Sequence, residues 1–153
     1  MRTESVRLPV AGARSLDVVK AKREEFERAI VPVLADLERQ HPGALRLELT
    51  PEESDLQAWL WDADGSGTGL FLGDGWESGI DAIVELADKV QEAAIEAVWG
   101  ITGSSNWPAC PEHPDGAPLS PGRHRGAAFW WCPRDRRAVA EIGSLPGRAA
   151  TLE

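Results

Sequence analysis

Two short motifs in the C-terminal third of the chain carry the residue types with the clearest chemistry. Cys110-Pro-Glu-His113 is followed, after eighteen residues, by Cys132-Pro-Arg-Asp135. Thiolate sulfur, imidazole nitrogen and carboxylate oxygen are donors that bind zinc in proteins. Two ligand pairs separated by this length fall inside the window used by zinc sites built from two tight turns. The spacing therefore makes this segment the first place to look for a metal.

Both motifs open with Cys-Pro, and the second lies between two strand-like runs at 127–131 and 137–142. In these features residues 107–145 resemble a zinc ribbon or zinc knuckle, in which two turns hold one structural Zn²⁺ tetrahedrally. The resemblance implies zinc as a structural cofactor. The ligands that it implies are Cys110, His113, Cys132 and Asp135. Because Asp135 stands where the pattern usually has Cys or His, His124 is an alternative fourth ligand.

Two alternatives to a metal remain open for Cys110 and Cys132. They pair in a disulfide, or they are two buried thiols that pack as small hydrophobic side chains. The chain begins without the basic and apolar segments of a secretory signal, which predicts a cytoplasmic location. A reducing compartment disfavours the disulfide.

Charge is distributed unevenly along the 153 residues, which carry a net charge of −9. Residues 1–106 have 20 acidic and 10 basic side chains, whereas residues 107–153 have 5 and 6. An acidic body repels nucleic acid and favours a basic partner. No segment approaches the ~18 consecutive apolar residues of a membrane helix, so we expect no membrane association.

Apolar periodicity predicts an α+β fold. Helical spacing follows a candidate N-cap at Ser15 and continues past Pro32 to His41, and it returns from Ser78 to Val98. Between these helices, alternation predicts an antiparallel meander with strands at 45–49, 55–61 and 70–72.

The predicted organisation has four parts. We expect an irregular segment at 1–14, because Pro9 and Gly12 interrupt it, and a frayed tail at 146–153. The α+β body spans 15–103, and the zinc-ribbon-like hairpin spans 107–145 and packs on the body.

Carboxylates recur along one face of the second predicted helix. They are Asp81, Glu85, Asp88, Glu92 and Glu96. Like charges at this spacing cost on the order of 0.2–0.5 kcal/mol per pair in an isolated helix. One interpretation is a solvated face, and the other is a docking surface for a basic partner.

Aromatic residues suggest a second surface. Trp59 and Trp61 share one face of the middle strand, Phe71 joins them from the next strand, and Trp130 and Trp131 of the hairpin could cover that face. An aromatic core and a ligand site are the two interpretations.

The loop between the second and third strands resembles part of a calcium loop. Asp62, Asp64 and Ser66 occupy its first ligand positions, but the acid required at the twelfth position falls on Gly73. The loop is therefore predicted to be a polar hairpin turn.

These features favour a small, acidic, non-catalytic interaction protein that docks a basic protein through its body. Immunity-type proteins that neutralise toxins are similar to it in charge and size. One alternative is a small zinc- or thiol-dependent enzyme with a tryptophan-lined pocket. Another is a nucleic-acid-binding ribbon that uses the arginines near Trp130 and Trp131. A homo-oligomer could also cover the aromatic face.

Overall fold

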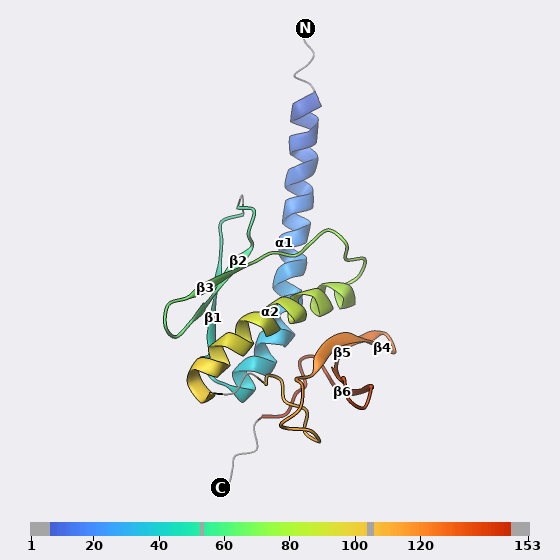
Figure 1. Ribbon diagram of the computed structural model, residues 1–153. Coiled ribbons are helices and arrows are strands. Elements are labelled where there is room, and N and C mark those ends of the chain that lie inside the picture. Colours follow the sequence, from blue (N-terminus) through green and yellow to red (C-terminus); the bar gives the residue numbers. More distant parts are fainter. Residues whose placement is uncertain (1–6, 53, 104–105, 148–153) are drawn as a thin grey trace.

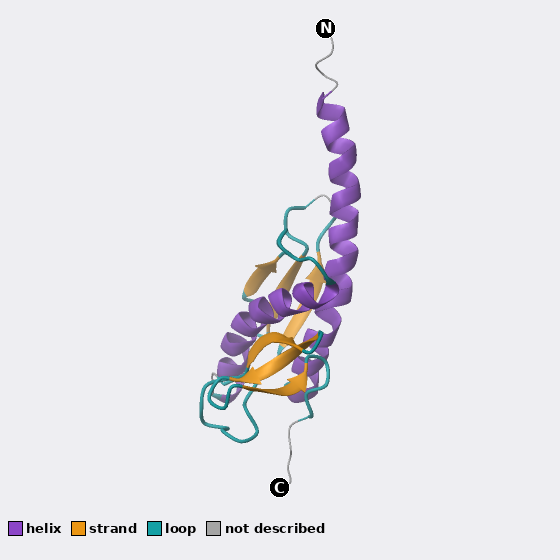
Figure 2. Ribbon diagram, turned by 90° about the vertical axis from the view of Figure 1, so that its right-hand side faces the viewer, coloured by secondary structure: helices purple, strands orange, loops and turns teal. Residues whose placement is uncertain are grey.

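The computed structural model describes residues 7–52, 54–103 and 106–147. Two helices and two three-stranded antiparallel sheets confirm the predicted α+β class (Figure 1). The elements are α1 (Arg7–Gln40), β1 (Leu45–Leu49), β2 (Ala58–Asp62), β3 (Gly67–Leu70), α2 (Gly79–Thr102), β4 (Ser120–His124), β5 (Ala127–Cys132) and β6 (Arg137–Glu141). Figures 1 and 2 show α2 lying between the two sheets and crossing the C-terminal half of α1.

The first helix begins earlier than the sequence predicted. Residues 7–14 are helical, whereas we expected residues 1–14 to be irregular; residues 1–6 lie outside the described part. Pro9 is the third residue of α1, where backbone N–H groups have no acceptor within the helix, so a missing N–H costs little there. The N-terminal half of α1 projects beyond the rest of the protein (Figure 1).

The first sheet forms the predicted meander in the order β1-β2-β3. Its third strand starts at Gly67 rather than at residue 70, because the Asp62 side chain accepts N–H bonds from Asp64 and Ser66 and shortens the turn. Gly67 pairs with Trp61, and a Cβ at Gly67 would come within 2.5 Å of the Trp61 ring. A larger residue at that position would therefore require the Trp61 ring to move.

The second helix matches the prediction closely. The Ser78 side chain caps its start by accepting the Asp81 N–H at 3.4 Å, and Gly103 ends it with a φ of 75°. Leu86 and Val90 on its apolar face are fully buried. Within the described part of the chain, neither helix has a stretch long and apolar enough to cross a membrane.

The C-terminal segment forms three strands instead of the predicted hairpin. The additional strand, β4, includes Pro121 and Gly122 and lies at the edge of the β4-β5-β6 sheet. An edge strand tolerates proline because its missing N–H needs no partner on the open side. Gly122 lies against Trp131, where a Cβ would approach the indole nitrogen to 2.6 Å.

A buried carboxylate joins this sheet to α1. Asp36 is 0% exposed and accepts hydrogen bonds from the Trp130 indole N–H at 2.8 Å and from the backbone N–H groups of Gly143 and Leu145 at 2.7 and 3.0 Å. The Arg39 guanidinium donates to the same carboxylate at 2.9 Å. These four hydrogen bonds offset the free-energy cost of burying a charged side chain.

Two glutamines add further polar connections. The Gln91 side chain of α2 donates to the backbone oxygens of Trp107 and Leu119, and the Trp107 indole donates to Gln40 of α1 at 2.9 Å. The chain between α2 and β4 is thereby fixed to both helices.

Replacing Asp36 by alanine should leave three N–H donors, two of them buried, without an acceptor. We expect the free energy of unfolding to fall by about 3–5 kcal/mol, the range for breaking a buried charged pair. Denaturant unfolding followed by fluorescence measures this loss. The control is Asp17→Ala, because Asp17 is exposed on the same helix. A loss for Asp36→Ala no larger than for the control would contradict the role of Asp36.

Candidate functional site

Two tight turns bring together three of the predicted ligands. In the first turn the His113 N–H donates to the Cys110 carbonyl at 3.1 Å, and in the second the Arg136 N–H donates to the Cys132 carbonyl at 2.7 Å. One ligand atom from each of Cys110, His113 and Cys132 lies within 4.8 Å of the others. These three residues could bind a metal ion.

The two sulfur atoms lie in a protected environment. Cys110 and Cys132 are 0% and 1% exposed, and both are free thiols in this structure. Cys132 is the last residue of β5 and shares its buried face with Ala128 and Trp130. The Asp135 N–H donates to the Cys132 sulfur at 3.2 Å.

The two candidates for the fourth ligand lie elsewhere. The Asp135 carboxylate groups with His113 and Glu112, not with the two sulfurs, and its Oδ2 is 3.0 Å from His113 Nε2. That hydrogen bond, aided by nearby arginines, lowers the pKa of Asp135. The His124 ring packs edge-on against Phe129 and Trp131, at centroid distances of 5.1 and 5.4 Å, and belongs to neither cluster.

The acidic face of α2 divides into two parts. Its N-terminal members are bonded within the protein: Asp81 pairs with Arg123, and Glu85 accepts from Lys89 at 2.9 Å and from the Gly73 N–H at 2.7 Å. The C-terminal members, Asp88, Glu92 and Glu96, are exposed. Only this second part is free to meet a partner.

A groove of about 480 Å³ opens beside the exposed part. Asp62, Asp64 and Ser66 of the β2–β3 turn line one side, and Glu96 and Trp99 of α2 are among the residues on the other. Trp99 is 59% exposed. Trp99 was not among the predicted site residues, although it lies three residues after Glu96 and so continues the 3–4 spacing of the carboxylates.

The two carboxyl groups of the turn influence each other. A side-chain hydrogen bond to Asp64 raises the pKa of Asp62, and the same bond lowers the pKa of Asp64. Two adjacent carboxylates repel, so one of them retains a proton more readily. A cation in the groove would relieve that repulsion.

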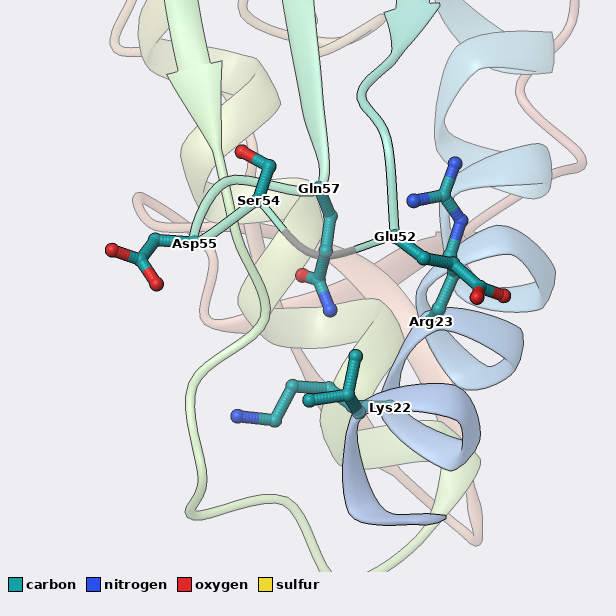
Figure 3. Close-up of a pocket in the computed structure, with 7 residues that line it drawn as sticks. Lys22, Arg23, Glu52, Ser54, Asp55 and Gln57 are labelled. Atoms are coloured by element: carbon teal, nitrogen blue, oxygen red, sulfur yellow. The ribbon is translucent and has the colours of Figure 1, made fainter. Parts of the chain in front are cut away.

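A second pocket, of about 160 Å³, lies between α1 and the loop that joins β1 to β2 (Figure 3). Lys22 and Arg23 come from the helix, while Ser54, Asp55 and Gln57 come from the loop side. Lys22 pairs with Asp74, and Arg23 pairs with Glu27 at 3.3 Å. Because both cations already have carboxylate partners, this pocket offers less unbalanced charge than the groove.

The predicted aromatic residues do not form one surface. Trp59 and Trp61 stack on β2 at 5.5 Å, and Phe71 lies under the Lys89 ammonium, 3.9 Å from the ring centroid. Trp130 is fully buried against Trp107. Trp131 lies on the opposite face of β5, beside His124. The C-terminal tryptophans thus pack within their own part of the protein.

Comparisons with protein-family models, with curated proteins and with solved structures find no match to this chain. The functional assignment therefore rests on the residues and their geometry.

Metal binding should stabilise the protein. We expect Zn²⁺ at about 100 times its Kd to raise the free energy of unfolding by about 2.7 kcal/mol, measured by denaturant unfolding with and without metal. His113→Asn should abolish this gain because it removes a ligand of the cluster. His124→Asn should retain it, and equal losses for the two variants would contradict the assignment.

Proposed function

We propose that this chain is a small, non-catalytic interaction protein that docks a basic protein partner at the groove between the β2–β3 turn and α2. The observation that carries the proposal is the composition of the groove, which combines three carboxylates, Asp62, Asp64 and Glu96, with the exposed indole of Trp99. Such a site suits a lysine or arginine side chain.

The indole and the carboxylates act together on a cationic side chain. A cation over an indole face gains about 0.5–1 kcal/mol at an exposed site and more when water is excluded. The carboxylates supply charge of the opposite sign, and Asp88 and Glu92 extend it along the exposed side of α2. Charge of this kind steers association and selects basic partners.

The second part of the proposal is a structural zinc ion in the C-terminal sheet. Two thiolates and one imidazole favour zinc over magnesium or calcium, which prefer oxygen ligands. Cys110 and His113 precede β4, and Cys132 ends β5, so an ion bound by all three would join the two segments. Both thiols must stay reduced to bind, which is consistent with a cytoplasmic location.

Charge reversal tests the docking surface. The variant Asp88→Lys/Glu92→Lys/Glu96→Lys should weaken binding of an oligo-arginine peptide roughly tenfold or more, since each exposed ion pair contributes about 0.2–1 kcal/mol. Calorimetry gives the affinity, and the indole N–H signal of Trp99 in NMR spectra locates the peptide.

The matched control is Asp17→Lys/Glu24→Lys/Glu27→Lys, which changes the net charge equally on exposed positions of α1. It should retain most of the affinity. Equal weakening by both triple variants, or a Trp99 signal that does not move, would show only non-specific attraction.

The affinity for the same peptide should also depend on pH. Hydrogen bonding between the two side chains raises the pKa of Asp62 and lowers that of Asp64, so Asp62 gains a proton before Asp64 as pH falls. A bound cation favours the ionised form, so affinity should decrease as pH falls through the raised pKa. In Asp62→Asn this decrease should begin at lower pH, whereas Asp55→Asn should follow the wild type. Calorimetric titrations between about pH 7 and pH 4 compare them.

A further inference from the structure

His113 belongs to two clusters of ligand-type atoms. One contains the sulfurs of Cys110 and Cys132, and the other contains the carboxylates of Glu112 and Asp135. Within the described residues, Asp135 groups only with the second cluster. The imidazole is therefore shared between a set of soft donors and a set of carboxylates.

We propose that Asp135 is a positioning residue rather than a metal ligand, and that the metal has three protein ligands with its fourth coordination position open to water or a small exogenous donor. This inference rests on the metal site of the proposed function. It replaces the fourth ligand that the sequence suggested.

The position of the proton on His113 follows from its contact with Asp135. Asp135 Oδ2 lies 3.0 Å from His113 Nε2, so the carboxylate accepts a hydrogen bond from a protonated Nε2. A neutral imidazole with its proton on Nε2 has its lone pair on Nδ1. Nδ1 is then the atom that binds the metal, and the carboxylate fixes both the tautomer and the ring orientation.

Asp135 supports a second ligand through its backbone. Its N–H donates to the Cys132 sulfur at 3.2 Å, while its side chain holds His113. One residue thus orients two of the three ligands. A carboxylate that moved onto the metal would give up its hydrogen bond to the imidazole.

Arg137 pairs with both carboxylates of the second cluster. Its Nη2 lies 2.8 Å from Glu112 Oε1, and its Nε lies 3.7 Å from Asp135 Oδ2. Asp135 therefore already has two cationic or donor partners, His113 and Arg137. This leaves it less available to a metal than a free side chain would be.

Charge balance supports the same arrangement. A Zn²⁺ ion with two thiolates and a neutral imidazole has no net charge, and water as the fourth ligand keeps it so. The sulfurs are almost fully buried, and a net charge at such a place is costly. Asp135 is balanced separately by Arg137, outside the coordination sphere.

Cobalt-substituted protein tests the open position directly. Co²⁺-loaded wild type should change its visible spectrum saturably when sodium azide is added, because azide replaces the water. An unchanged wild-type spectrum would overturn the proposal. If the spectrum of Asp135→Asn alone then responded to azide, Asp135 would be identified as the fourth ligand.

Asp135→Asn should bind one metal per chain with the same cobalt spectrum as the wild type. Its metal affinity should fall about 10–100-fold, the usual effect of losing an outer-shell partner. Asp115→Asn is the control, because Asp115 is an exposed acid in the same segment and belongs to neither cluster. A changed cobalt spectrum in Asp135→Asn, or an equal loss of affinity in the control, would count against the positioning role.

The tautomer of His113 provides an independent measurement on unaltered protein. Long-range ¹H–¹⁵N spectra of the zinc-loaded chain should show a protonated Nε2 and a metal-bound Nδ1. A metal-bound Nε2 would overturn the inference while leaving the zinc site intact. Failure of the wild type to bind zinc or cobalt at all would instead remove the metal site itself.

Discussion

The arrangement of this protein depends on one buried carboxylate, that of Asp36. The side chain lies in the C-terminal half of α1, yet three of its four hydrogen-bond donors come from residues 130–145. A buried carboxylate is tolerated only where donors surround it, so these bonds select one position for the C-terminal sheet. The bond to Trp130 also fixes the place of Cys132, because Cys132 lies two residues further along the same face of β5. The location of the sulfurs thus follows from a contact with the first helix.

The second helix has different roles on its different faces. Its apolar face fills the core between the sheets, with Leu86 and Val90 fully buried. Near its N-terminus the carboxylates are used internally, since Asp81 bonds Arg123 of β4 and Glu85 bonds the chain before the helix at Gly73. From Asp88 onward the carboxylates of the helix are exposed. The carboxylates available to a partner are therefore confined to one end of α2, although the sequence distributes them along its whole length.

Periodicity predicted both helices and the first meander because apolar residues at those positions pack locally. It failed where a distant contact decided the outcome. Pro121 and Gly122 look unsuited to a strand, but the edge position tolerates the proline, and the glycine leaves room for the Trp131 ring. No local pattern predicted that the Asp36 carboxylate is buried and hydrogen-bonded, because its donors are about a hundred residues away.

The candidate site was likewise predicted only where local spacing was enough. Spacing was sufficient to indicate that Cys110, His113 and Cys132 converge. It could not indicate the direction of the Asp135 carboxylate, because that depends on the positions of His113 and Arg137 in the folded chain. Trp99 could have been predicted from the sequence, because it continues the spacing of the exposed carboxylates.

The groove and the metal site share no residue. The groove is built from the β2–β3 turn and the end of α2, whereas the ligands come from the segment before β4 and from the end of β5. Their connection is structural: Gln91 of α2 holds the chain at Trp107 and Leu119, on either side of the turn that contains Cys110 and His113. A metal that fixes this turn would therefore support the helix that presents Glu96 and Trp99, without taking part in recognition. Recognition at the groove and metal binding are thus proposed to depend on different residues.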